Sequence, residues 1–354
     1  MSYVNTISVG GFRTGHVQGI AIDSKKEYMY YSFTTCLVKS DMKGNVIGTV
    51  NGLAGHLGCI AYNPDDGRIY GSLEYKHDCI GTGILNRLHQ KTDVIDGFYI
   101  AIFDVEKINR LDMDAEKDQV MTSVYLKEVA DDYLAPGHRY GCSGIDGVTF
   151  APIPGSKSPE KYLYVAYGIY GDVNRKDNDY QIILRYDIGN WHLYEKPLDQ
   201  SAMHKQGPSS PDAKYFIYTG NTTFGIQNLE YDPHTNYMFA AVYLGEKKTF
   251  PNYPLFAIDM TKIARQQDLK GIGHYGQVLT LAEAGETDVH TGIRGFTFAY
   301  GATGMISLGD SWFYFSHDKY SKEEGWSTTI KLYQYTQETF AVTVQPSLQE
   351  KLIP

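Results

Sequence analysis

The chain has 354 residues, of which 42% are hydrophobic, and a mean hydropathy of -0.34, which indicates a globular protein with a sizeable core. Its formal net charge of -9 excludes the basic surface that nucleic-acid binding requires. It contains no apolar run of about 18 residues and no secretory signal pattern at its start, so we expect no membrane partner and a cytoplasmic location. The four cysteines lack CxxC spacing and are expected to be reduced.

A short strand pattern returns five times along the chain. Its copies are residues 16–22, 56–62, 144–150, 225–231 and 292–298. Each copy is followed by a turn and by a second strand rich in aromatic residues, at 28–31, 68–71, 162–165, 237–240 and 312–315. A repeated unit made only of strands is typical of a radial array of small sheets. The sequence therefore predicts an all-β, five-bladed β-propeller with four-stranded antiparallel blades around a central channel.

Third and fourth strands complete the predicted blades. Third strands at 37–41, 100–104, 183–187 and 255–259 all end on aspartate, which favours a tight turn, and a fifth is expected at 330–335. Fourth strands are expected at 46–50, 122–128, 192–197, 278–282 and 341–345. The blades then span residues 15–53, 54–134, 135–200, 214–284 and 290–346 of a single domain. A strand at 3–9 resembles a fourth strand and could close the ring, with or without 341–345.

One column of the repeat differs between the copies. The third position of each seven-residue copy, two residues before an apolar residue at the fifth, is occupied by Gln18, Gly58, Asp146, Gln227 and Arg294. Since side chains alternate along a strand, the residue two places earlier lies on the same side; it is histidine in the first two copies, His16 and His56. This polar set predicts either a ligand site near the channel axis or a group of side chains that hydrogen-bond around a water-filled channel.

Loops at one end of the predicted ring add further candidates. Loops that lead into the first strands carry His138 and His290, and loops between second and third strands carry Glu74, Tyr75 and His317. Binding residues are often placed on loops that a rigid scaffold holds. His16, His56 and His138 could together hold a divalent metal, although histidines beside glycine turns also serve as capping or stacking groups. No cofactor is indicated otherwise.

The chain resembles five-bladed β-propeller proteins in general, on its repeat pattern rather than on a diagnostic motif. The resemblance implies the fold, and its members include arabinanase- and invertase-like glycosidases, calcium-activated nucleotidases and sugar-binding lectins. Propeller polysaccharide lyases, which have more blades, use histidines and a glutamine around a metal with an arginine near the uronate. His16, His56, Gln227 and Arg294 look somewhat like that set.

The expected function is that of a soluble enzyme acting on a carbohydrate or other polar small molecule by lyase- or hydrolase-type chemistry. In this hypothesis Arg294 neutralises an anionic group, His56 or His138 moves a proton, and Asp146 orients the histidine or binds hydroxyls. Gln18, Glu74, Gln227 and His317 would contact the substrate, and Tyr75, Tyr167 and Tyr243 would stack on a sugar face. The alternative is a non-catalytic module that binds a glycan or peptide at the same place, and a plain interaction scaffold is a third interpretation.

Overall fold

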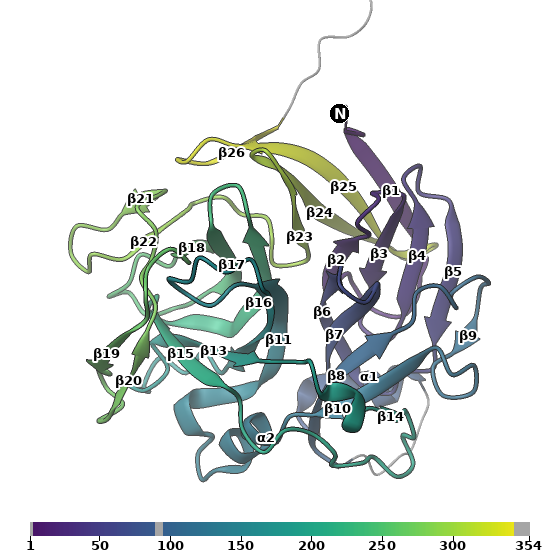
Figure 1. Ribbon diagram of the computed structural model, residues 1–354, viewed down its shortest axis with the longest axis horizontal. Coiled ribbons are helices and arrows are strands. Elements are labelled where there is room, and N and C mark those ends of the chain that lie inside the picture. The colour runs from purple at the N-terminus through teal and green to yellow at the C-terminus, as the bar shows by residue number, and fades with distance from the viewer. Residues whose placement is uncertain (1–2, 89–94, 343–354) are drawn as a thin grey trace, which may run out of the picture.

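The structure, a computed structural model, describes residues 3–88 and 95–342. Five small antiparallel sheets stand in a ring around a central axis (Figure 1), so the predicted five-bladed β-propeller is confirmed. The innermost strands are β2 (Gly19–Ile22), β6 (His56–Asn63), β11 (Cys142–Ala151), β16 (Thr222–Asp232) and β23 (Met305–Gly309). Each inner strand contacts the next in this order, and β23 contacts β2, which closes the ring.

The first and second strands of blades 2 and 4 are joined by turns of one chemistry. In the turn after β6, the backbone N–H of Asp65 donates to the side chain of Asn63 (3.1 Å), and Gly67 has a φ of +70°. In the turn after β16, the N–H of Thr235 donates to the Asp232 carboxylate (2.9 Å). Asp and Asn stabilise such turns because their short side chains accept hydrogen bonds from the following backbone. These turns fix the register of the hairpins that carry the inner strands.

Blades 1 and 2 are regular. Blade 1 contains β2, β3 (Tyr28–Ser32), β4 (Leu37–Asp41) and β5 (Val46–Asn51), with β9 (Met113–Asp114) at its edge. Blade 2 contains β6, β7 (Arg68–Tyr75), β8 (Gly97–Phe103) and β10 (Met121–Tyr125), with β14 (Lys196–Pro197) at its edge. Two helices, α1 (Cys79–Leu88) and α2 (Lys127–Leu134), follow the second and the fourth strand of blade 2.

Blades 3 and 4 depart from the predicted fourth strands. Blade 3 contains β11, β12 (Tyr162–Ile169), β13 (Tyr180–Tyr186) and β15 (Ala213–Tyr218), with β20 (Tyr275–Val278) and β19 (Arg265–Asp268) outside them. The predicted strand at 192–197 is wrong for this blade, because β14 pairs with β10 of blade 2. Blade 4 has three strands, β16, β17 (Tyr237–Leu244) and β18 (Leu255–Asp259). At 278–282, Leu281 forms only an isolated bridge to Ile258 of β18.

Blade 5 begins later than the repeat pattern suggested. It contains β23, β24 (Trp312–Ser321) and β25 (Gly325–Tyr335), completed by β1 (Thr6–Phe12) and β26 (Phe340–Val342). Both terminal strands pair with β25: β1 along Trp326 to Lys331, and β26 along Tyr333 to Tyr335. The N-terminal strand therefore closes the ring and accompanies the C-terminal one, of which residues 343–345 lie outside the described residues.

Residues 292–298 do not form an inner strand. Within them β22 (Arg294–Gly295) pairs with β21 (Glu286–Thr287), and Phe296 forms a bridge to Leu255 of β18. This segment therefore runs along the outer edge of blade 4. Its apolar residues pack against that blade, where Phe296 is 1% exposed, so the segment keeps a strand-like pattern without facing the channel.

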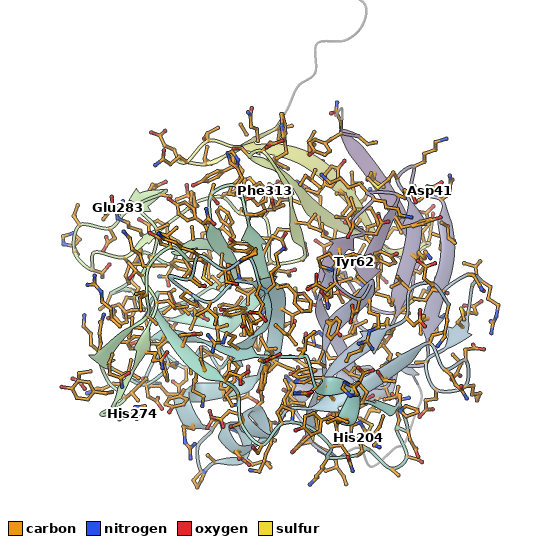
Figure 2. The ribbon with its side chains drawn as sticks, viewed as in Figure 1. Asp41, Tyr62, His204, His274, Glu283 and Phe313 are labelled. Carbon is orange, nitrogen blue, oxygen red and sulfur yellow. The ribbon has the colours of Figure 1, made fainter. Side chains whose placement is uncertain are left out.

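The core lies between neighbouring blades, not along the axis. Aromatic side chains dominate the contact between blades 4 and 5, where the rings of Phe239, Phe313 and Phe340 pack edge to face (Figure 2 labels Phe313). Tyr30, Tyr70 and Tyr164 are buried in the other interfaces. These three tyrosines serve packing between the sheets. Of the helices in the two described ranges, none is long and apolar enough to cross a membrane.

Candidate functional site

A cavity of about 330 Å³ lies at one mouth of the channel and receives residues from all five blades. Its lining includes His16, Gln18, His56, Glu74, Lys76, Ser143, Asp146, Phe224, Gln227, Tyr243 and Trp326. Helix α1 borders it as well, through residues such as Ile80 and Ile84. The structure thus brings together six of the predicted site residues (Gln18, His56, Glu74, Asp146, Gln227 and Tyr243) and the predicted metal ligand His16.

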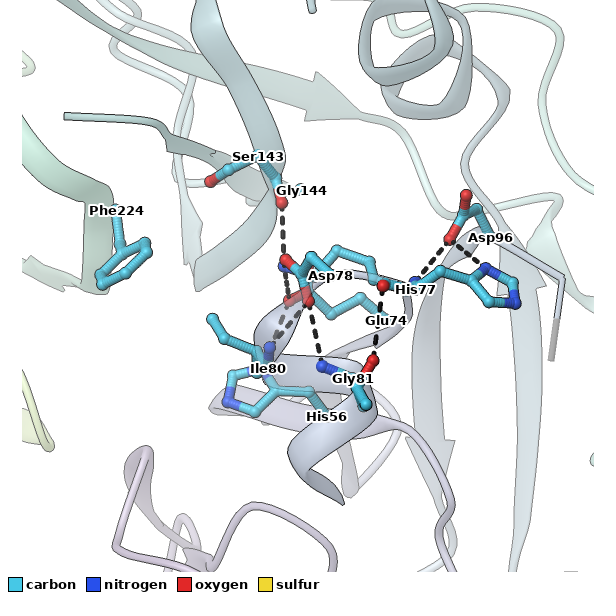
Figure 3. Close-up of polar contacts among 12 residues, drawn as sticks. His56, Glu74, His77, Asp78, Ile80, Gly81, Asp96, Ser143, Gly144 and Phe224 are labelled. Carbon is cyan, nitrogen blue, oxygen red and sulfur yellow. Dashed lines mark hydrogen bonds and ion pairs between the residues drawn. The ribbon is translucent and has the colours of Figure 1, made fainter. Parts of the chain in front are cut away.

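Glu74 is the centre of a buried ion network (Figure 3). Its Oε1 lies 2.5 Å from Nζ of Lys76, which lies 3.3 Å from the Asp78 carboxylate and donates to the carbonyl of Ser143 (2.9 Å). The backbone N–H of Ile145 donates to Glu74 Oε2 (3.1 Å). Burial alone would raise the pKa of Glu74, but Lys76 and His56 together outweigh it and hold the pKa below its usual range. Glu74 is therefore a fixed anion.

His56 lies beside this anion. Its Nδ1 is 3.6 Å from Glu74 Oε1, which leaves Nε2 at the other side of the ring. Burial works to lower the pKa of His56, but Glu74 and then Asp146 favour the charged imidazolium, and the net pKa is raised. His56 therefore favours its protonated form beside the fixed anion.

Asp146 has the opposite environment to Glu74. It is 8% exposed, and burial raises its pKa to about 7. Its Oδ1 has no hydrogen-bond partner among the described residues, and the same holds for the nearby hydroxyl of Ser72. A buried carboxyl group is held as the neutral acid up to unusually high pH, because burial disfavours its charged form. Asp146 can therefore donate a proton near neutral pH.

Gln18 and Gln227 are held in fixed orientations. Nδ1 of His16 donates to the carbonyl of Val17 (2.8 Å), so the neutral ring accepts at Nε2 from the Gln18 amide (3.0 Å). The amide of Gln227 donates to the carbonyl of Phe224 (3.0 Å). Both glutamines line the cavity, where ordered amides serve recognition.

Phe224 reaches the cavity from a bulge in β16. The register of β16 against β17 shifts between Thr223 and Ile226, and Phe224 has a φ of +62°, a strained conformation for an aromatic residue. The bulge leaves the ring 38% exposed beside the cavity, across from the Glu74 network in Figure 3. With Tyr243 and Trp326 it supplies apolar and aromatic surface to an otherwise polar site.

Five predicted residues lie elsewhere. Arg294 borders a different pocket on the outer edge of blade 4, so its assignment to the channel was wrong. Tyr75 and Tyr167 are fully buried, and their hydroxyls donate to Gln200 and Asp132 (3.0 and 2.9 Å), which leaves no ring face for a sugar. His317 borders a separate groove between blades 4 and 5. His138 stands outside the cavity lining.

The predicted metal site is not formed. Nδ1 of His138 donates to the carbonyl of Tyr133 (2.6 Å), and its ring packs between Tyr133 and Tyr170. Both ring nitrogens of His16 take part in the hydrogen bonds described above. Across residues 3–88 and 95–342 no group of three or more His, Cys, Asp or Glu residues could hold a metal ion.

Sequence reasoning missed Lys76, Ser72, Phe224 and Trp326. Lys76 follows Glu74 and Tyr75 in a charged segment of the sequence, and a lysine between two acids is equally typical of a solvent-exposed loop. Phe224 next to Gly225, at the start of an otherwise regular strand, was a local sign of a bulge. Ser72 and Trp326 carry no sequence signal of this kind.

No protein-family model matches this chain, and no curated protein matches it. Similar solved structures include a "putative exo-beta-1,3-galactanase" from Bifidobacterium bifidum s17, 8% identical over 98% of each chain with a TM-score of 0.42. The PQQ domain of pyranose dehydrogenase from Coprinopsis cinerea is 10% identical over 88% of this chain and 81% of its own, with a TM-score of 0.38. A functionally unknown protein from Desulfotomaculum acetoxidans DSM 771 is 11% identical over 93% and 69%, with a TM-score of 0.35. Similarity this low carries no argument about activity.

Proposed function

We propose that the channel-mouth cavity binds a sugar and that the protein hydrolyses a glycosidic bond there by acid–base catalysis. The observation that carries the proposal is the buried carboxyl of Asp146, unpaired at Oδ1 and with its pKa raised to about 7, beside His56 and the fixed anion Glu74. Titratable groups whose environments push their pKa values in opposite directions are typical of acid–base sites.

The lining supports a sugar as the ligand class. A pyranose ring presents hydroxyl groups at its rim and C–H groups on its faces, and the cavity combines Asp146, Gln18 and Gln227 with the rings of Phe224 and Tyr243. The volume of about 330 Å³ lies at the lower end of the range of roughly 300–1,000 Å³ for small-molecule sites, which suits one ring.

The charges favour hydrolysis of a neutral sugar over elimination from a uronate. Lys76 is the cavity's lysine, and Glu74 and Asp78 already neutralise it; Arg294, expected to bind a carboxylate, lies elsewhere. In the proposed reaction Asp146 gives its proton to the leaving glycosidic oxygen as the C–O bond breaks. His56, beside Glu74, takes in its neutral form a proton from the water whose oxygen bonds to the anomeric carbon. Turnover therefore requires Asp146 protonated and His56 unprotonated, and the raised pKa of His56 limits the second condition at low pH.

The test is turnover of nitrophenyl glycosides and unmodified disaccharides by the wild type and by Asp146→Asn. We expect the variant to lose about 10²- to 10⁴-fold in kcat/KM. Glu230→Gln is the matched control, because burial also raises the pKa of Glu230, to about 8, and it stands at the opposite end of the same ring of strands. Binding without turnover in the wild type would instead establish a sugar-binding module, and absence of both would refute the proposal.

A further inference from the structure

A second hollow adjoins the cavity on the same face of the ring. It has a volume of about 740 Å³ and lies between the loops of blades 4 and 5. Tyr243 lines both spaces. Burial raises the pKa of Tyr243, and the carboxylates of Asp146, in the cavity, and Asp318, in the groove, add to the effect. Because Tyr243 lines both spaces, its phenol stands at the point where cavity and groove meet.

One wall of the groove is aromatic. The ring of Tyr300, 42% exposed, lies 4.0 Å from the ring of His317, measured between centroids. Nε2 of His317 pairs with the hydroxyl of Tyr333 (3.0 Å), and the two rings are stacked. Burial, and then Lys331, lowers the pKa of His317 to about 4, so this wall is uncharged at neutral pH. Exposed aromatic rings held by such contacts offer a ready face for an apolar surface.

The groove also offers hydrogen-bond acceptors. Asp318 is exposed and lines it. Asn252 lines it as well; its Nδ2 donates to the carbonyls of Lys247 (3.2 Å) and Phe250 (3.0 Å), which fixes the amide. Its buried Oδ1 has no partner within the described part of the chain. The exposed carboxylate of Asp318 is therefore the acceptor that a ligand's hydroxyl groups can reach, beside the fixed amide of Asn252.

We propose that the groove is a second sugar subsite, so that the ligand is a saccharide of at least two rings whose linkage lies beside Tyr243. This inference rests on the proposed function, which places the first ring in the cavity. The second ring would lay its C–H face on Tyr300 and donate its hydroxyls to Asp318. The same proton donor, Asp146, then stands on the cavity side of the linkage.

The experiment compares one-ring and two-ring probes by calorimetry. The probes are the methyl pyranosides of glucose, galactose, mannose and xylose and their disaccharides joined through sulfur, which resist hydrolysis. We expect the best two-ring probe to bind the wild type about tenfold more tightly than its one-ring counterpart. Tyr300→Ala should remove about five- to tenfold of the two-ring affinity and leave the one-ring affinity unchanged.

Tyr275→Ala is the matched control, since Tyr275 is an exposed tyrosine on β20 at the outer edge of blade 3. Equal affinity for both probe sizes, or a Tyr300→Ala effect that is the same for both, would overturn the subsite while leaving the cavity as a one-ring site. If the wild type binds no one-ring and no two-ring probe, the proposed function fails and the subsite fails with it.

Discussion

Gly58 and Asp146 occupy the same column of the repeat on neighbouring blades, and the absence of a side chain on the first makes room for the second. A Cβ on Gly58 would stand 2.1 Å from Oδ1 of Asp146 and 2.5 Å from the hydroxyl of Ser72. Gly144 stands in the same relation to Glu74, since its Cβ would lie 2.0 Å from Oε2. Both carboxylates of the site thus rest against glycine backbone on an inner strand.

Gly58→Ala is therefore expected to displace the Asp146 carboxyl. Overpacking of this kind destabilises a protein by about 1–3 kcal/mol, and sugar binding or turnover should fall by at least about tenfold because Asp146 loses its position. Urea unfolding and a kinetic or calorimetric assay measure the two effects. Gly189→Ala is the control, since its Cβ would meet only the flexible carboxylate of Asp187, at 3.2 Å. Full activity in Gly58→Ala would show that Asp146 needs no fixed place.

The repeat pattern predicted the ring because its apolar and aromatic positions are dictated by packing between blades. The second strands begin where expected, at Tyr28, Arg68, Tyr162, Tyr237 and Trp312. The fifth first strand was misplaced because residues 292–298 carry the same apolar pattern while packing on blade 4. The spacing between first and second strands could have located this strand correctly. Ile20, Ile60 and Leu229 each stand eight residues before the start of their second strand. The same spacing before Trp312 gives Gly304, which directly precedes β23.

The candidate site was predictable only in part. Gln18, Asp146 and Gln227 follow from strand alternation, because Asp146 and Gln227 lie on inner strands and Gln18 directly precedes one, and the repeat defines the direction of these strands. Lys76 and Phe224 do not, because a loop conformation and a bulge decide where their side chains go. Tyr75 and Tyr167 looked like ligand-stacking residues, yet alternation places them equally well in the interface between blades, where the structure buries them. Residue type alone does not separate the two environments.

Asp146 should make the protein less stable as pH rises. In the folded chain its carboxyl keeps the proton up to about pH 7, whereas an unfolded aspartate releases it near pH 4. Between these values the folded state binds more protons, so the free energy of unfolding contributed by this group falls with increasing pH. Asp146→Asn removes the effect, and its stability relative to wild type should rise between pH 4 and 7 and level off above. A pH-independent difference in melting temperature would contradict the raised pKa.

The Glu74–Lys76 pair should behave in the opposite sense and show strong coupling. Glu74 has a lowered pKa, so its contribution to stability is present above the pKa of an unfolded glutamate and is lost as pH falls through the folded value. Removing one partner of a buried pair costs about 3–5 kcal/mol, because the other charge remains buried. Glu74→Gln and Lys76→Met should each be strongly destabilising and the double variant clearly less so than their sum. An additive double variant in urea unfolding would show that the pair is not coupled.

The strained backbone at Phe224 should lower the stability of the protein while the Phe224 ring contributes to binding. Alanine is normally about 0.5–1 kcal/mol more stable than glycine within a strand, but a φ of +62° reverses the preference because only glycine adopts it without strain. Phe224→Gly is therefore expected to be more stable than Phe224→Ala, by about 1 kcal/mol, while both bind sugar more weakly than the wild type. Denaturation of the two variants measures the order; an alanine variant that is the more stable would mean that the bulge is not strained.

The closing strand β1 should matter more than β26. Ile7 of β1 is 1% exposed and packs between blades 5 and 1, whereas Val342 of β26 is 56% exposed. Ile7→Ala should lower the free energy of unfolding by about 2–5 kcal/mol, and Val342→Ala by no more than about 0.5 kcal/mol. Ile7→Ala should also weaken ligand binding, because β1 pairs with β25 and β25 carries Trp326, which lines the cavity. Equal effects of the two substitutions on thermal unfolding would argue that the C-terminal strand shares the closure of the ring.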